Sequence, residues 1–537
     1  MNILAVIPAR AGSKGIPNKN IRFIAGHPLI YYAIKNAISS KYITDVVVTT
    51  DSQLVRVIAE QMGAFVRMRD ESLCQDDVTL DAVVDDVVEN MTYKAWDYVV
   101  TMQPTSPTLS VDTLDKAIHY SIINDLDTVI SAINAPSLSW KIDESGRKVP
   151  NYEKRLNRQY LPPCYMETGA FVVSKANVVN AETRIGSKVD VFEVPEVESQ
   201  DIDDFSDLIS ASAMLDRKKV AIYVNGNNKI GLGHIYRTLE IADEFYLKPD
   251  IYYNKNETDV HAFGRTTHKL IPVNDVSELF VRCKREKYTI FINDVLSTSS
   301  KYMMQLRENL PSKAKIINFE DDGDGASKAD LVFNALLGKS TQKNIYTGEK
   351  YYVCSKAFMF YQPITIGNIV RTILVSFGGA DPQNYTERIL SIIKGKSYEK
   401  YKFTIVLGRA KRNVEELMKY NALDNVKILY DVENMPEIMS TADIAITSRG
   451  RTGYELSMLG IPAIVMAQNM RETKHKFMCA DNGFDYLGLN PSDEMIKAHL
   501  DLYLGLSKLE RKRCQDLMLR HDLYGGRKRI MRLIDSL

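Results

Sequence analysis

The 537-residue sequence lacks paired cysteines, long apolar runs and an excess of either charge. None of its six cysteines forms a CxxC pair, which argues against zinc and redox motifs and favours a reducing compartment. No run of about 18 uninterrupted apolar residues occurs, and the chain opens on a short apolar segment without a basic leader. We therefore expect a cytoplasmic protein with neither a membrane span nor a signal peptide.

Charge and length bound the class of protein. Lys+Arg and Asp+Glu each number 68, so the basic excess that is typical of a nucleic-acid-binding protein is missing. Hydrophobic residues make up 45% and charged residues 25%, which is ordinary globular composition and excludes disordered, collagen-like and coiled-coil chains. Residues 1–217 hold 21 basic and 30 acidic side chains, a net charge of −9, so the rest carries +9. At about 150 residues per domain, we expect several domains of different character.

The apolar pattern predicts an α/β protein with three domains. Short apolar runs near 46–50, 97–102 and 128–132 alternate with amphipathic segments at 54–62 and 79–91, which indicates a mainly parallel sheet covered on both faces. A helix expected over 205–215 ends in a charged cluster, after which the run 220–226 opens a new series of strands. We place a boundary near 217–219.

A second division lies near residue 365. Strands are expected near 289–292 and 315–318 before it, and near 371–377, 403–407, 444–447 and 463–466 after it. Two Rossmann-like halves with a cleft between them are the natural interpretation. The expected domains are thus residues 1–217, 219–365 and 366–537.

A glycine-rich and basic loop follows the first strand. Gly12 and Gly15 permit sharp turns that bring backbone N–H groups close to an anion, and Arg10, Lys14 and Lys19 supply cations. The Walker spacing is absent, which excludes an ordinary P-loop. A basic surface loop is the alternative, but ligands of open α/β sheets bind at the carboxyl ends of strands.

The segment Ile7–Asn20, IPARAGSKGIPNKN, resembles the signature of the CMP-sialic acid synthetases (acylneuraminate cytidylyltransferases). Further matches follow in order at 49–52, 69–73, 103–107, 158–159 and 200–203. The resemblance implies a Rossmann-like nucleotidyltransferase domain that transfers CMP from CTP to a nine-carbon 2-keto sugar acid and releases pyrophosphate. It implies catalytic roles for Arg10 and Lys19 on the triphosphate, and a CTP and sugar site made of Ala9, Arg10, Gly12, Ser13, Lys14, Lys19, Asn20, Arg69 and Gln103.

Asp201 and Asp203 match the metal carboxylates of that family. Charge develops on the phosphoryl oxygens and on the leaving pyrophosphate, and Mg²⁺ or a similar ion held by carboxylates neutralises it. The alternative is an acidic helix start favoured by the helix dipole. Glu167–Phe171 departs from the family's sugar-pocket pattern, so the substituents of the sugar, whether sialic, legionaminic or pseudaminic, stay open.

A second motif lies after the 220–226 run. Gly231 and Gly233 precede His234, and Arg237 follows three residues later at the start of an expected helix. The positive end of the helix dipole disfavours imidazolium and helps to keep His234 neutral, as a general base requires. A capping or packed histidine is the alternative.

Two further glycine turns, 376–382 and 448–455, follow strands of the last third. Their amide groups would cradle a diphosphate, and Glu455 would accept a hydrogen bond from a ribose hydroxyl, unless the turns merely connect strands. Together with His234 and Asn469, residues 219–537 resemble the UDP-sugar hydrolase of pseudaminic acid biosynthesis, a GT-B-type fold.

That resemblance implies hydrolysis of a UDP-linked 2,4-diacetamido-2,4,6-trideoxyhexose without a metal cofactor. His234 would activate water and Asn469 would help to position it. The implied UDP-sugar ligands are Gly231, Gly233, Arg237, Gly378, Gly379, Ser448, Arg449, Thr452 and Glu455.

Two other interpretations of the back half stay open: a glycosyltransferase, and a non-catalytic half that binds nucleotide sugar and regulates the front domain. The front family also implies a homodimer through the N-terminal domain. Because the two activities are not consecutive steps, we further expect association with the nonulosonic acid synthase that would act between them.

Overall fold

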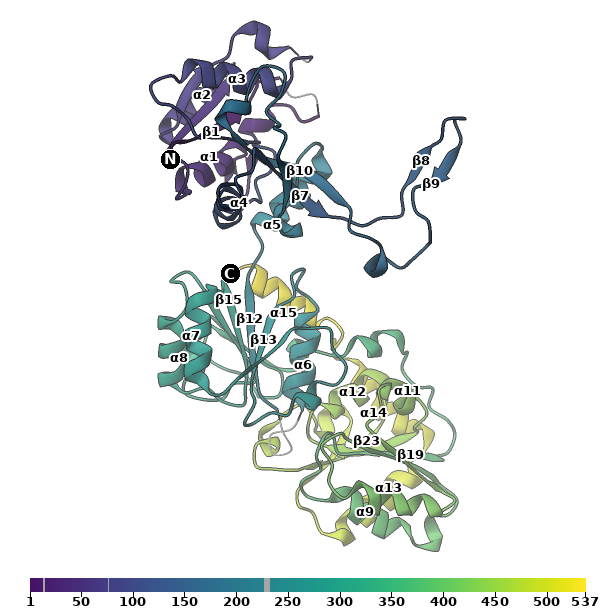
Figure 1. The fold of residues 1–537 in the computed structure, drawn as a ribbon. Coiled ribbons are helices and arrows are strands. Elements are labelled where there is room, and N and C mark those ends of the chain that lie inside the picture. The colour runs from purple at the N-terminus through teal and green to yellow at the C-terminus, as the bar shows by residue number, and fades with distance from the viewer. Residues whose placement is uncertain (13–14, 76, 227–231) are drawn as a thin grey trace. The chain divides into compact units, whose positions relative to one another are not determined.

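The computed structural model describes residues 1–12, 15–75, 77–226 and 232–537 (Figure 1). The chain forms two compact units, residues 1–217 and 218–537, and each is described by itself. Among the described residues, no helix is long and apolar enough to cross a membrane.

The first unit is built on one seven-stranded sheet with the order β11-β7-β10-β6-β1-β4-β5. Strand β10 runs antiparallel to both of its neighbours, β6 and β7, and the other pairs are parallel. The strands are β1 (Ile3–Pro8), β4 (Asp45–Thr50), β5 (Phe65–Met68), β6 (Tyr98–Met102), β7 (Thr128–Asn134), β10 (Tyr165–Lys175) and β11 (Val189–Glu193). The mainly parallel α/β sheet expected from the apolar runs is confirmed.

Side chains alternate between two buried faces of this sheet. Ile3, Ala5 and Ile7 of β1 pack with helices α1, α2 and α4, whereas Leu4 and Val6 pack with α3. Such alternation requires strands that are apolar throughout. The helices are α1 (Ile30–Ser39), α2 (Gln53–Gln61), α3 (Leu80–Asn90), α4 (Val111–Ile123) and α5 (Phe205–Leu215).

Two short antiparallel ladders complete the first unit. One pairs β2 (Phe23–Ile24) with β3 (His27–Pro28), just before α1. The other pairs β8 (Trp140–Ile142) with β9 (Lys148–Pro150), a hairpin that stands away from the main sheet of the unit (Figure 1).

The second unit begins with a fully parallel sheet in the order β14-β13-β12-β15-β16-β17-β18. Its strands are β12 (Val220–Val224), β13 (Asp250–Asn254), β14 (Leu270–Val273), β15 (Ile290–Asp294), β16 (Lys315–Phe319), β17 (Leu331–Asn334) and β18 (Ile345–Thr347). The helices of this half are α6 (Gly233–Ala242), α7 (Val276–Glu286) and α8 (Ser300–Glu308).

The other half of the second unit is again fully parallel, in the order β21-β20-β19-β22-β23-β24. Its strands are β19 (Thr372–Ser376), β20 (Lys402–Leu407), β21 (Val426–Tyr430), β22 (Ile444–Ser448), β23 (Ala463–Ala467) and β24 (Phe484–Leu489). Its helices are α9 (Tyr385–Ile393), α10 (Val414–Met418), α11 (Met435–Ser440), α12 (Thr452–Leu459), α13 (Asp493–Gly505) and α14 (Lys508–Leu519). Two Rossmann-like halves in one unit are the expected GT-B-like architecture.

The last helix, α15 (Gly526–Asp535), differs from the expected division at residue 365. It returns to the first half, where Ile530 and Ile534 join the core around β12. Arg527 also reaches two glutamates of that half, with Nη1 3.2 Å from Glu240 Oε2 and 3.1 Å from Glu244 Oε1. The C-terminus therefore ties the halves together, and residues 366–537 are not one independent lobe.

Candidate functional site

The loop after β1 is anchored on the end of the neighbouring strand β4. The amide of Ala9 donates to Thr49 O over 3.0 Å, and the amide of Ala11 donates to Asp51 Oδ1 over 2.6 Å. Asn20 Nδ2 closes the loop by donating to Arg10 O over 3.0 Å. Gly12 has open space where a side chain would lie. The predicted residues Ser13 and Lys14 lie outside the described residues.

The acidic segment that holds Asp201 and Asp203 packs directly on this loop. A Cβ atom on Gly15 would come within 2.3 Å of Asp203 O, so only glycine fits there. Lys19 Nζ donates to Ile202 O over 2.7 Å and lies 3.5 Å from Asp203 Oδ1. Lys19 and Ile202 are 183 positions apart in sequence, so the fold joins the basic loop and the acidic segment into one site.

Asp201 faces the middle of β10. A Cβ atom on Gly169 would lie 3.5 Å from Asp201 Oδ2 and 3.4 Å from Gln103 Nε2, and Gly169 has a φ of +70° that favours glycine. Asp201 Oδ1 is buried without a hydrogen-bond partner. Burial raises the pKa of Asp201, and the nearby Asp203 carboxylate adds to this shift.

Arg69 lies beside the loop at the end of β4. Its Nη2 donates to Thr49 O over 3.1 Å. Burial lowers the pKa of Arg69, and the nearby charge of Arg10 adds to the effect while Asp51 opposes it. Two guanidinium groups and Lys19 thus gather at the carboxyl ends of β1 and β4, where a polyanion would be neutralised.

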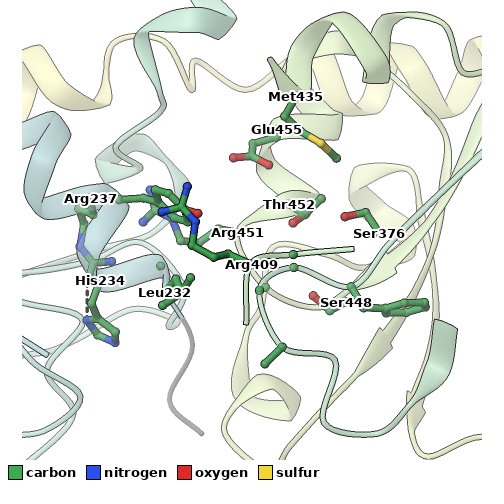
Figure 2. Close-up of a pocket in the computed structure, with 18 of the residues that line it drawn as sticks. Leu232, His234, Arg237, Ser376, Arg409, Met435, Ser448, Arg451, Thr452 and Glu455 are labelled. Atoms are coloured by element: carbon green, nitrogen blue, oxygen red, sulfur yellow. Dashed lines mark hydrogen bonds between the residues drawn. The ribbon is translucent and has the colours of Figure 1, made fainter. Parts of the chain in front are cut away.

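A cleft of about 780 Å³ lies between the two halves of the second unit (Figure 2). Most of the predicted UDP-sugar residues line it: Gly233, His234, Arg237, Gly378, Gly379, Ser448, Thr452, Glu455 and Asn469. Gly231 lies outside the described residues. Arg449 is not among the lining residues, because its guanidinium lies 3.7 Å from the ring centre of Tyr486 and donates to Thr473 O.

His234 is held by a carboxylate at the end of β15. Its Nδ1 lies 2.6 Å from Asp294 Oδ1, and Arg237 Nε donates to Asp294 Oδ2 over 2.9 Å. Burial lowers the pKa of His234, and Arg237 and Arg471 add to this shift while Asp294 opposes it. Although burial acts against it, the charge of Arg237 holds the pKa of Asp294 low.

These contacts define the chemistry of the imidazole. An ionised Asp294 accepts a hydrogen bond from Nδ1–H, which leaves a lone pair on Nε2 of a neutral ring. The same arrangement fixes the ring plane, so His234 is equipped to take a proton from a nucleophile in the cleft.

The opposite wall is formed by the glycine turns of the second half. Gly378, with a φ of +71°, and Gly379 pass close to Gly408, where a Cβ atom would come within 2.3 Å of Gly378 O. Glu455 is half-buried at the start of α12, and burial raises its pKa. Asn469 Oδ1 accepts a hydrogen bond from the amide of Glu472 over 3.0 Å.

Sequence reasoning missed Asp294, the buried partner of His234, and several residues that line the cleft. A carboxylate at the carboxyl end of an apolar strand was a usable signal, since such ends face the ligand side of a parallel sheet. The missed lining residues include several with titratable side chains, among them Glu320, Arg409, Arg451, Arg471, Glu472 and His475.

Comparison with known proteins finds a family match within the first unit. Residues 4–194 match the family described as cytidylyltransferase. The CMP-N,N'-diacetyllegionaminic acid synthase of Legionella pneumophila is 38% identical over 154 residues, covering 28% of this chain and 66% of that protein.

Two further similarities involve longer stretches. The spore coat polysaccharide biosynthesis protein SpsG of Bacillus subtilis is 26% identical over 290 residues, covering 49% of this chain and 81% of that protein. The crystal structure of Acinetobacter baumannii MurG matches 60% of this chain and all of that chain, with 13% identity and a TM-score of 0.44. The chain spans 65% and 52% of the length of the first two curated relatives that it matches.

Proposed function

We propose that the first unit is a cytidylyltransferase that activates a nine-carbon 2-keto sugar acid. The anomeric hydroxyl of the acid attacks the α-phosphate of CTP, the bond to the β-phosphate oxygen breaks, and pyrophosphate leaves. The observation that carries this proposal is the joining of the basic loop to the acidic segment through Lys19, Ile202 and Asp203. The match of residues 4–194 to the cytidylyltransferase family supports it.

Each side chain has a task in this reaction. Arg10 and Lys19 bind the triphosphate and offset the charge that grows on the leaving pyrophosphate. Arg69 and Gln103 position the nucleotide and the sugar on either side of the loop.

Asp201 and Asp203 would hold a Mg²⁺ ion. The buried and unpartnered Asp201 Oδ1 fits that role, because an unsatisfied carboxylate oxygen is costly without a ligand. No group of three or more His, Cys, Asp or Glu side chains suited to a metal occurs among the described residues. Two carboxylates suffice for Mg²⁺, which takes its remaining ligands from phosphate and water and stabilises the developing phosphate charge.

The experiment for the first unit is a mass-spectrometric assay of the full chain with CTP, Mg²⁺ and each of three acids: sialic, legionaminic and pseudaminic. We expect a CMP-linked product with one of them and equimolar pyrophosphate. Pyrophosphate release without any CMP-sugar, or no turnover with all three acids, would contradict the proposal.

We propose that the second unit hydrolyses a UDP-linked diacetamido-trideoxyhexose. His234 Nε2 takes a proton from water, the water oxygen bonds to the anomeric carbon, and the bond to the UDP oxygen breaks. This proposal rests on the buried pair of His234 and Asp294, of which His234 lines the cleft. Arg409, Arg451 and Arg471 line the same cleft and supply positive charge for a leaving diphosphate without a metal.

The experiment for the second unit is incubation of the full chain with the UDP-sugar in the absence of an acceptor, followed by separation of UDP and free sugar. We expect both products, with one oxygen-18 atom in the sugar when the reaction runs in labelled water. Turnover only after an acceptor is added would make the unit a glycosyltransferase, and binding without turnover would make it a regulatory half.

We also propose that the chain forms a homodimer through the first unit. The hairpin β8–β9 exposes Trp140 and Ile142, at 59% and 69%, and an isolated two-stranded hairpin is marginally stable in water. Sedimentation equilibrium should show a dimer for the wild type and a monomer for the double variant Trp140→Ser/Ile142→Ser. A monomeric wild type would refute this proposal.

Association with the nonulosonic acid synthase is a separate proposal, tested by co-sedimentation of the two proteins.

A further inference from the structure

Three buried polar atoms of described cleft residues have no hydrogen-bond partner: Glu320 Oε2, Gln468 Oε1 and His475 Nε2. Glu320 follows β16 in the first half, and His475 follows a short 3₁₀ segment, Glu472–Lys474, in the second half. Both residues line the cleft, and they are only 3% and 4% exposed. A buried polar group left unsatisfied costs about 1–3 kcal/mol, so a ligand that satisfies both is a physical explanation for them.

Glu320 Oε2 and His475 Nε2 are both hydrogen-bond acceptors. His475 Nδ1 lies 2.5 Å from Arg449 O, and a carbonyl oxygen only accepts, so Nδ1 carries the proton. Burial lowers the pKa of His475, which favours the neutral ring and leaves a lone pair on Nε2. Glu320 Oε1 is occupied by Arg237 Nη1 at 3.2 Å, so only Oε2 is left for a ligand.

The backbone of Glu320 is held in an unfavourable conformation at the same place. Its φ of +54° lies in the left-handed region, which costs a non-glycine residue about 1 kcal/mol. The amide of Glu320 donates to Phe333 O over 2.8 Å, and Arg471 Nη2 donates to Glu320 O from the other half of the unit. Strained residues that the surroundings hold in place gather at ligand sites.

Contacts of Glu320 also place it near the reacting end of the cleft. Arg237 contacts both Glu320 Oε1 and Asp294, and Asp294 holds His234. Glu320 belongs to the first half, whereas the glycine turns expected to receive the diphosphate belong to the second half.

We propose that Glu320 and His475 form an acceptor subsite that binds O–H or amide N–H groups on the sugar ring of the nucleotide sugar. The inference rests on the proposed function only in that the cleft binds a UDP-sugar. In this proposal Glu320 and His475 select the sugar, and their unpartnered oxygen and nitrogen are not expected to bind the nucleotide.

Calorimetric titration of the full chain with UDP, UDP-glucose and UDP-N-acetylglucosamine tests this subsite. Glu320→Gln should bind UDP within twofold of wild type but bind a UDP-sugar about tenfold more weakly, since a charge-assisted hydrogen bond is lost. A loss with UDP-N-acetylglucosamine alone identifies the amide N–H as the donor, and a loss with both sugars identifies a hydroxyl. His475→Phe, which removes the acceptor of the other wall, should give the same selective loss.

Glu278→Gln is the matched control, because Glu278 pairs with Arg282 on helix α7 of the same half, away from the cleft residues. It should leave all three affinities unchanged. The subsite is refuted if Glu320→Gln weakens UDP as much as the UDP-sugars, or weakens none of them. Absence of UDP binding in the wild type would instead refute the proposed function, whereas UDP-sugar binding without hydrolysis would refute only the hydrolase activity.

Discussion

The two candidate sites differ in how much of their charge the protein itself balances. In the first unit the side chain of Asp203 is 82% exposed, and Asp201 has an unpartnered oxygen. In the second unit Asp294 is 1% exposed and is bound by both His234 and Arg237. The first site leaves its carboxylates exposed or partly without partners, whereas the second holds its histidine with buried groups of its own. Substitutions should therefore act through ligand and metal binding in one unit and through proton transfer in the other.

The largest expected effect comes from His234→Gln. Loss of the general base should lower kcat for UDP-sugar hydrolysis by about 10²- to 10⁴-fold. CMP transfer by the same protein serves as the internal control and should be unchanged. A retained hydrolysis rate would remove His234 from the chemistry.

Asp203→Ala should lower CMP transfer by about 10²-fold, because one ligand of the proposed Mg²⁺ ion and the partner of Lys19 disappear together. The measurement is pyrophosphate release as a function of Mg²⁺ concentration. Asp204→Ala is the matched control, since Asp204 caps helix α5 instead, and it should alter stability more than rate. Equal rates for wild type and Asp203→Ala at all Mg²⁺ concentrations would contradict the metal assignment.

The pH dependence separates the role of Asp294 from simple packing. In the proposed hydrolysis a neutral His234 is the active form, and its pKa lies below the ordinary value, so kcat/KM should fall only as the pH drops below about 6.5. Asp294→Asn should reduce kcat about 10²-fold, because an amide that donates to Nδ1 places the proton on Nε2. Since Asp294 raises the pKa of His234, the acidic limb in this variant should also move to lower pH. An unchanged acidic limb together with a normal kcat would show that Asp294 only fills space.

The smallest effect is expected for Arg449→Lys. Its guanidinium lies over Tyr486, so the change should alter UDP affinity less than about twofold while removing about 1 kcal/mol of stability. Arg451→Lys is the matched comparison, because Arg451 lines the cleft, and it should weaken UDP binding about tenfold. Calorimetry measures the UDP affinity of both variants, and thermal unfolding measures their stability. A larger loss of UDP affinity in Arg449→Lys than in Arg451→Lys would mean that Arg449 turns towards the ligand.

The fold was largely predictable because its strands are local features. The runs near 46–50 and 444–447 correspond to β4 and β22 within one residue at each end, since buried parallel strands are apolar throughout. Helix α15 was not assigned correctly to a half. Its Ile530 and Ile534 predict a buried face, but no local pattern tells which sheet that face covers.

The two candidate sites were predictable to different degrees, because local sequence patterns show which residues lie in a loop but not which distant residues pair with them. Glycine and lysine spacing in the loop after β1 is a local signal, so Lys19 and its neighbours were found from sequence. The partner of His234 lies 60 positions away, at the end of another strand, and pairing of that kind is set only by the sheet order. The placement of Arg449 was missed for a related reason. The turn that holds Arg449 was found, but the direction of its side chain depends on Tyr486 in a later strand.

We propose that the chain carries two independent active sites, and a single paired assay tests this. Wild type, Lys19→Ala and His234→Gln are each given CTP, the sugar acid, Mg²⁺ and the UDP-sugar, and CMP-sugar and UDP are measured together. We predict that Lys19→Ala loses only the CMP-sugar and that His234→Gln loses only UDP release. Loss of both products in either variant, or of neither, would contradict the account.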